Sequence, residues 1–194
     1  MTASVALPPG LPARELAARI DSGLRALDAR ILTAWERLTP AQRSQPRADG
    51  GWSAEQLLEH LTIANSAYLA TMRRGVPATL APSEAPWTPS VAGRLLAWSL
   101  RGSFKLPAPG PARPGPQARP AVLEALTGTH AEVRNLLART RHADWSAVRL
   151  VSPLSSLVHM NLGDVFVVLL VHGERHTGQL ERLVDQITGG PARA

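Results

Sequence analysis

Hydrophobic residues recur at every third or fourth position in four long stretches of the chain. On an α-helix this spacing gathers them along one side, so each stretch is predicted to form an amphipathic helix with one buried face. The predicted long helices span about residues 11–38, 53–74, 120–140 and 162–188, and a shorter helix is predicted over 91–100. No stretch alternates convincingly between hydrophobic and polar residues, so no strand is predicted.

Polar residues mark the starts of two of these helices. Ser53 is followed three residues later by Gln56, which is the arrangement of a capping box. Asn161 stands in the same relation to Asp164 and is predicted to cap the last helix. The glycines and the proline over residues 189–191 then predict where that helix stops.

The four long helices are expected to pack as one all-α domain, because each has an apolar face that only the others can bury. The predicted fold is a four-helix bundle over residues 11–188, with flexible tails at 1–10 and 189–194. Between the second and third long helices, residues 106–120 hold six prolines in fifteen positions and are predicted to be a loop. A connection of this length allows a crossover rather than a simple up-down-up-down order.

The composition narrows the classes of function. The chain has 194 residues, is 44% hydrophobic and has no cysteine, which excludes disulfides, cysteine nucleophiles and cysteine metal ligands. No signal peptide or transmembrane segment is recognisable, so a cytoplasmic location without a membrane partner is expected. The formal net charge of +6 comes from scattered arginines, so a solvated basic surface is a better interpretation than nucleic-acid binding.

Three histidines are candidates for a metal site. His172 and His176 are four residues apart in the last predicted helix and therefore share one of its faces. His60 lies on the inward face of the second long helix. Three neutral imidazoles from two helices would form a facial site with open positions for water or substrate. The ion would be zinc or nickel, or else iron or manganese, and the sequence assigns no catalytic residue beside it.

The alternative interpretation is that inward histidines are simply hydrogen-bonded in the core, since histidine pairs at this spacing also recur by chance. Two further residues are candidates for a supporting role. Gln179 follows His176 by about one turn and could orient it, although a buried core amide is an equal alternative. His130 lies on an inward face of the third long helix, whereas His142 and His159 are predicted to lie in loops.

Two segments of the sequence resemble the signatures of a known family. The run from Gly51 to Leu61 begins with Trp-Ser at a helix start and ends in His60-Leu61. The second segment has His159 and Gly163 ahead of His172-Gly-Glu-Arg-His176, with Gln179 after it. In order and spacing the two segments resemble the DinB-like superfamily of metalloproteins, of the DinB/YfiT type and including its DinB_2 branch. The resemblance covers roughly residues 15–188.

This resemblance implies a four-helix bundle of up-down-down-up topology and a divalent metal ion bound by His60, His172 and His176. It also implies a homodimer and transfer of a small-molecule thiol of the mycothiol, bacillithiol or glutathione type. Because the chain has no cysteine, that thiol would have to come from a substrate. Two alternatives stay open, namely a metal-dependent hydrolase that uses the same site and a non-catalytic metal-binding or structural bundle.

Overall fold

The computed structural model describes residues 7–47, 50–102 and 108–190, and most of them are helical. Its four long helices are α1 (Ala13–Glu36), α3 (Ala54–Gly75), α5 (Val122–Thr140) and α6 (Leu162–Thr188). These are the four helices that the hydrophobic spacing predicts, so the mainly helical fold class is confirmed. Parts of the predicted tails, residues 1–6 and 191–194, lie outside the described residues, as do residues 106–107 of the proline-rich segment.

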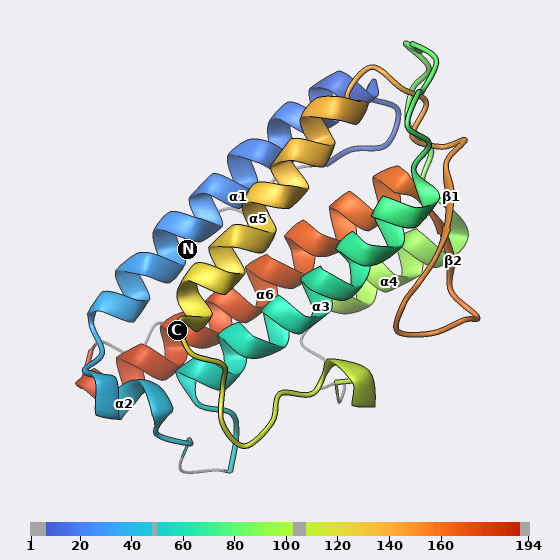
Figure 1. Cartoon of the computed structure of the whole chain (residues 1–194). Helices are drawn as coiled ribbons and strands as arrows, with labels where there is room; N and C mark the ends of the chain where they lie inside the picture. The colour runs from blue at the N-terminus through green and yellow to red at the C-terminus, as the bar shows by residue number, and fades with distance from the viewer. Residues whose placement is uncertain (1–6, 48–49, 103–107, 191–194) are drawn as a thin grey trace.

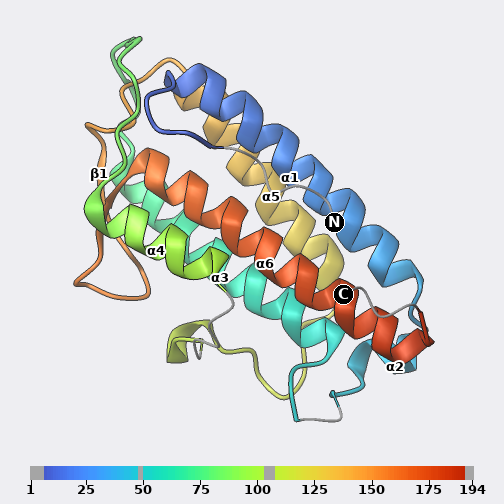
Figure 2. The same ribbon diagram turned by 180° about the vertical axis from the view of Figure 1, so that it is seen from behind.

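Each long helix packs mainly against two of the others. Helix α1 contacts α5 and α6, and α3 contacts the same two helices, so the four close a bundle around one core. Figures 1 and 2 show this arrangement. In Figure 1, α1 and α6 run toward the end of the bundle where α2 lies, and α3 and α5 run away from it.

Helix α6 is the most deeply buried element of the bundle. Its first ten residues, from Leu162 to Val171, are all buried, which accounts for their nearly continuous hydrophobic sequence. The face that the other long helices leave uncovered is covered by α4 (Val91–Arg101), the predicted short helix. As a result α6 carries its histidines into the interior of the molecule rather than onto its surface.

Side chains at the start of α6 hold α4 in place. The predicted capping box of Ser53 with Gln56 is present. Asn161 caps α6 as predicted and forms a capping box with Asp164. The Asp164 carboxylate also accepts a hydrogen bond from the Ser90 N–H at 3.2 Å, directly ahead of α4. Helix α4 is therefore tied to the cap of the helix that it covers.

Three local elements differ from the predicted ones. Residues Arg149–Val151 and His159–Asn161 form an antiparallel pair, β1 and β2, although no strand was predicted. Each strand has three residues, too few for the alternating pattern to be visible in the sequence. His159 therefore lies on β2 and not in a loop, which corrects the prediction. A five-residue helix, α2 (Pro40–Ser44), was also missed; Thr39 and Gln42 form its capping box.

The proline-rich segment holds little regular structure in its described part. Between residues 108 and 121 the structure has one 3-10 turn, η1 (Gly110–Ala112). This segment leads from α4 to α5 and contacts α3 along the way. Its position beside α3 becomes important at the functional site.

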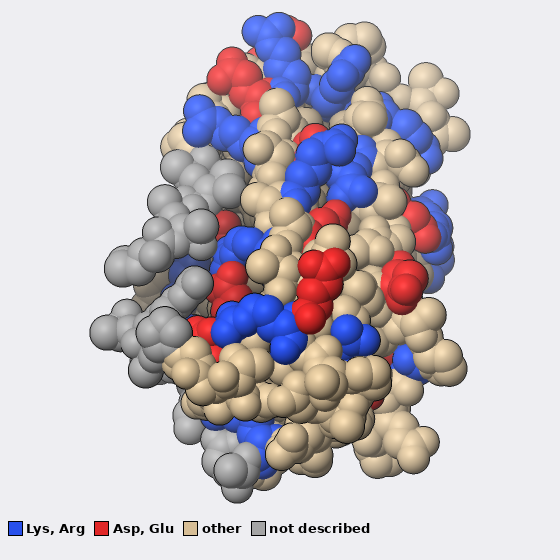
Figure 3. All heavy atoms as spheres, turned by 90° about the vertical axis from the view of Figure 1, so that its left-hand side faces the viewer, with Lys and Arg blue, Asp and Glu red and all other residues tan. Residues whose placement is uncertain are grey.

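Charges of both signs are mixed on the surface that Figure 3 shows, which is the side of the molecule where α1 lies. Arg30 pairs with Glu181 and Arg37 with Asp185, so ion pairs join α1 to α6. Within the described residues, no helix is long and apolar enough to cross a membrane.

The close contact between α6 and Trp87 gives a test of the packing at the start of α6. A Cβ on Gly163 would overlap the Trp87 indole, whose Nε1–H donates to Asn161 Oδ1 at 3.0 Å. Gly163→Ala is therefore expected to lower the free energy of unfolding by about 1–3 kcal/mol. The control is Gly128→Ala on the exposed face of α5, where a Cβ meets no atom. Higher helix propensity should make that variant more stable by about 1 kcal/mol. Urea denaturation measures the unfolding free energy of both variants. If both substitutions changed it in the same direction, the packing of Gly163 against Trp87 would be contradicted.

Candidate metal centre

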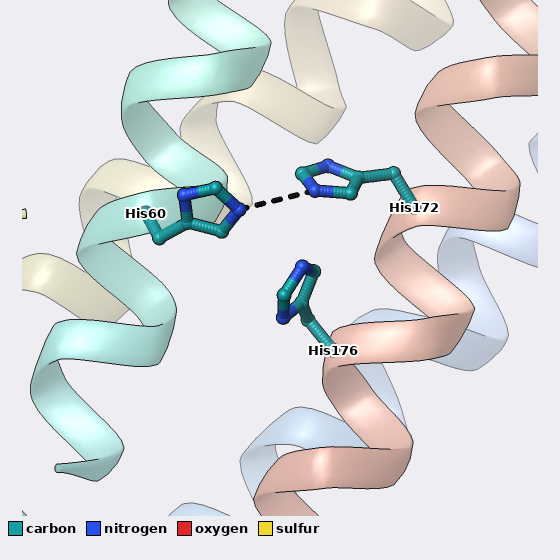
Figure 4. A group of neighbouring side chains, drawn as sticks. All are labelled: His60, His172 and His176. Carbon is teal, nitrogen blue, oxygen red and sulfur yellow. Dashed lines mark hydrogen bonds between the residues drawn. The ribbon is translucent and has the colours of Figure 1, made fainter. Parts of the chain in front are cut away.

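Three histidines from two helices converge inside the bundle. His60 comes from α3, and His172 and His176 come from successive turns of α6 (Figure 4). One ring nitrogen from each lies within 4.8 Å of the other two. The Nε2 atoms of His60 and His172 are 3.1 Å apart, and the three ring centroids are separated by 4.6–5.0 Å. The structure thus brings together the three histidines that were singled out in the sequence.

Hydrogen bonds fix the orientation of two of these rings. His60 Nδ1 lies 2.6 Å from the carbonyl oxygen of Ala112 in η1. A carbonyl can only accept, so Nδ1 of His60 carries the proton and Nε2 keeps its lone pair. His176 Nδ1 lies 2.8 Å from Gln179 Oε1, which has the same effect on that ring. Both Nε2 lone pairs are therefore available to bind an ion.

The surroundings keep all three imidazoles neutral. Burial lowers the pKa of His60, although the Ala112 carbonyl acts in the opposite direction. Burial, the neighbouring histidines and Arg175 together hold the pKa of His172 well below its usual range. Burial and the charges of His60 and Arg175 lower the pKa of His176 to about 3. Neutral imidazoles are the form that binds metal ions, so none of the three needs to lose a proton near neutral pH.

The histidines open into a cavity of about 740 Å³ between α3, α4 and α6. Its walls are mainly apolar side chains, and polar atoms are few. The Tyr68 hydroxyl lies 3.1 Å from Ser152 Oγ, and burial raises the pKa of Tyr68. Arg175 also lines the cavity, and its Nη1 donates to the carbonyl oxygens of Leu100 and Gly102 at 3.1 and 2.5 Å. Its place in the sequence, between His172 and His176, predicts that Arg175 lies on the opposite side of α6 from the two histidines. Because Arg175 lines the cavity, that prediction is wrong.

The proline-rich segment forms part of the wall beside the histidines. Ala108 and Pro109 line the cavity. Glu59, the neighbour of His60, accepts hydrogen bonds from Arg119 Nε at 2.8 Å and Nη2 at 2.8 Å. Arg119 holds the pKa of Glu59 below its usual range, although burial acts against this. The Glu59–Arg119 pair thus fixes the segment that presents the Ala112 carbonyl to His60.

The remaining candidates from the sequence lie elsewhere, with the exception of Gln179. His130 is buried at 1% exposure, but its Nδ1 lies 2.5 Å from Asp28 Oδ1 on α1 and it does not line the cavity. In the structure His130 therefore forms a contact between α1 and α5. His142 and His159 are exposed and lie outside the triad. The missed contributors were the Ala112 carbonyl and the Glu59–Arg119 pair, which no local sequence pattern reveals.

The donor set fits a divalent ion. It consists of three neutral nitrogens in a partly buried site, with two of the rings oriented by hydrogen bonds from their other nitrogen. Protein sites for zinc and related ions commonly have these features, and catalytic ones keep a further position open. The adjoining cavity provides the space for that position.

Comparisons with known proteins support this description of the fold. The model of a family described as the DinB superfamily matches residues 24–180. Among solved structures, the chain is similar to YfiT from Bacillus subtilis, with 18% sequence identity and a TM-score of 0.61. The match covers 96% of this chain and 95% of that one. YfiT is described as a probable metal-dependent hydrolase with an unusual four-helix bundle topology. No curated protein sequence matches the chain.

Proposed function

The chain belongs to the DinB superfamily, and on this basis we propose that it is a metal-dependent enzyme whose divalent ion is held by His60, His172 and His176. The convergence of these three side chains, within 4.8 Å at the end of a cavity, is the observation that carries the proposal. YfiT, which has a similar fold, is described as a probable metal-dependent hydrolase, and this supports the proposal. Zinc and nickel are the proposed ions, because imidazole nitrogens suit both. Iron and manganese are the alternatives.

The proposed chemistry follows from the charge of the site. Three neutral ligands leave the full charge of a divalent ion in place, which would strongly lower the pKa of a thiol or water bound to it. The residues of the chain supply orientation: Ala112 and Gln179 direct two imidazoles, and the apolar cavity walls limit the access of water. Lower water content strengthens electrostatic interactions at the reacting atoms.

We propose transfer of a small-molecule thiol as the reaction. Among the described residues that line the cavity there is no aspartate or glutamate, so no carboxylate stands ready as a general base. A thiol needs less help than water to ionise, since its pKa is about 8.5 against about 15.7 for water. The chain has no cysteine, so the thiol would enter as a substrate of the mycothiol, bacillithiol or glutathione type.

Hydrolysis at the same site is the second candidate, because the fold is shared with YfiT and that protein is described in these terms. Two assays of metal-loaded protein separate the candidates. One supplies chlorodinitrobenzene with each thiol in turn, and the other supplies p-nitrophenyl acetate without thiol. Thiol-dependent turnover that is lost in His176→Ala supports the transferase. Turnover of the ester alone favours the hydrolase, and neither activity in a protein that binds the ion favours a non-catalytic metal-binding bundle.

Gln179 provides a finer test of the site, because it is expected to change the affinity for the metal ion without binding the ion itself. Replacing it by leucine removes the acceptor for His176 Nδ1, and loss of such a contact typically weakens metal binding about 10–100-fold. Gln179→Leu is therefore expected to keep one ion per chain but to bind it about tenfold more weakly. Gln186→Leu, an exposed position on the same helix, is the control. Competition with a chelating dye measures both, and equal affinities in the two variants would remove Gln179 from the site.

The wider proposal includes a homodimer in the cytoplasm, a setting with which the lack of cysteine agrees. It also includes the up-down-down-up topology, which the helix directions in Figure 1 support. Sedimentation of the purified protein is the measurement for the dimer.

A further inference from the structure

The cavity extends well beyond the three histidines. On α3, Ala64 and Tyr68 follow His60 at intervals of one helical turn, and all three line it. Eight residues of helix correspond to about 12 Å, so the cavity continues from the triad for roughly that distance along α3. On α6, Val168 and Leu169 line the same part. We call this extension the inner arm. It is lined by Ala64, Tyr68, Leu96, Leu154, Val168 and Leu169.

The inner arm has almost entirely apolar walls. Ala64, Val168 and Leu169 form its floor and are at most 3% exposed. Leu96 from α4 and Leu154 from the loop between β1 and β2 complete the wall and are half-buried. Apolar surfaces of this kind favour an apolar occupant, because contact with water there costs free energy.

Ser99 on α4 also lines the cavity, and its Oγ donates to the Leu96 carbonyl oxygen at 2.8 Å. Other polar groups lie at the two ends of the inner arm. At one end lie the three histidines with Gln179, and at the other the Tyr68 hydroxyl is paired with Ser152. Arg175 is the one side chain with a permanent charge among the described residues lining the cavity. Its Nη1 is engaged with the carbonyl oxygens at the end of α4. A highly charged molecule would therefore find little compensation inside the inner arm.

We infer that the electrophilic substrate is an amphipathic molecule, with a polar head that meets the histidine site and an apolar chain that fills the inner arm between α3, α4 and α6. The position of the head rests on the proposed function. The position of the chain rests only on the shape and lining of the cavity. Since the thiol also reaches the histidines, it approaches them from the side of Gly50 and Trp52, where the lining includes an exposed residue.

Binding of uncharged amides to the metal-free protein tests the proposed position of the apolar chain separately from that of the polar head. Butanamide, hexanamide and octanamide have no strong affinity for metal ions and differ only in length. Burial of each methylene is expected to tighten binding roughly fourfold, measured by calorimetry. Affinity that does not change with length would overturn the inference, whatever the metal content of the protein.

Two neighbouring leucines of α4 give matched variants. Leu96 lines the inner arm, whereas Leu95 is 61% exposed and does not line the cavity. Leu96→Ser is expected to weaken octanamide binding about fivefold, because it removes apolar contact with the chain. Leu95→Ser is expected to change it by less than about twofold. An equal loss in both variants would place the amide outside the inner arm and would overturn the inference.

Hydroxamates of the same lengths test the position of the head. Octanohydroxamate should bind more tightly to zinc-loaded protein than to metal-free protein, and more tightly than acetohydroxamate. If the amides show the length dependence but zinc adds nothing to hydroxamate binding, the head is not at the histidines and the proposed function fails. If zinc tightens hydroxamate binding but the length of the ligand does not change its affinity, the proposed function stands and the inference about the apolar chain of the substrate fails.

Discussion

Replacing His176 with alanine is expected to abolish tight binding of a divalent ion. The free energy of zinc binding by four-ligand protein sites is about 10–16 kcal/mol, or about 3 kcal/mol per ligand, so losing one ligand weakens binding about 100-fold or more. The fold should survive, because His176 borders a cavity rather than filling the core. Metal analysis after dialysis, on protein purified without an affinity metal column, measures the loss.

The same result is expected for His60→Ala and His172→Ala, because all three nitrogens belong to one group. His159→Ala is the matched control, since His159 is an exposed histidine on β2 and lies outside that group. Full metal content in any of the three triad variants, or an equal loss in the His159 variant, would contradict the assignment of the site.

Replacing Asp28 with alanine is expected to produce a large loss of stability. The Asp28 carboxylate binds His130 Nδ1 at 2.5 Å and Arg134 Nη1 at 2.8 Å, and so joins α1 to α5. Breaking a fully buried pair costs about 3–5 kcal/mol, and partial exposure of Asp28 and Arg134 places the expected loss at about 3 kcal/mol or slightly below. Urea denaturation at neutral pH measures it. Asp21→Ala, which removes an exposed pair with Arg25 on the same helix, should cost less than about 1 kcal/mol.

The contribution of Asp28 is expected to depend on pH. Burial alone would raise the pKa of Asp28, but its hydrogen bonds and the charges of His130 and Arg134 outweigh burial and lower it. A carboxyl group with a lowered pKa in the folded state stabilises the fold above its unfolded value of about 3.9. This stabilisation is lost as the pH falls through the folded pKa. The difference between wild type and Asp28→Ala should therefore shrink as the pH falls below about 4. If the difference in unfolding free energy instead became larger as the pH fell, the lowered pKa of Asp28 would be contradicted.

The long helices and their ends could be predicted because their signals are local. Hydrophobic residues at helical spacing determine which face is buried, and Ser53 and Asn161 satisfy the first amides of α3 and α6. The same periodicity placed His60, His172 and His176 on inward faces. Their meeting followed from packing α3 against α6, for which the family signatures gave the order of the two segments.

Contacts between distant segments could not be predicted in this way. The Ala112 carbonyl acts through the backbone, so its residue type carries no signal for its bond to His60. His130 has the same inward spacing as the triad, and only the position of α1 shows that its partner is Asp28. The strands β1 and β2 are too short to have a visible period and form through pairing with each other. Each of these features depends on tertiary structure that the local pattern does not contain.

X-ray absorption spectroscopy of the protein loaded with zinc or nickel tests the metal centre most directly. We expect one ion per chain whose spectrum shows three imidazole nitrogens at about 2.0–2.1 Å, with the remaining position taken by an oxygen from solvent. His176→Ala should reduce the imidazole number by one or leave no ion to measure. A loaded protein whose spectrum shows no imidazole, or shows the same imidazole number after the loss of His176, would contradict a metal centre formed by His60, His172 and His176.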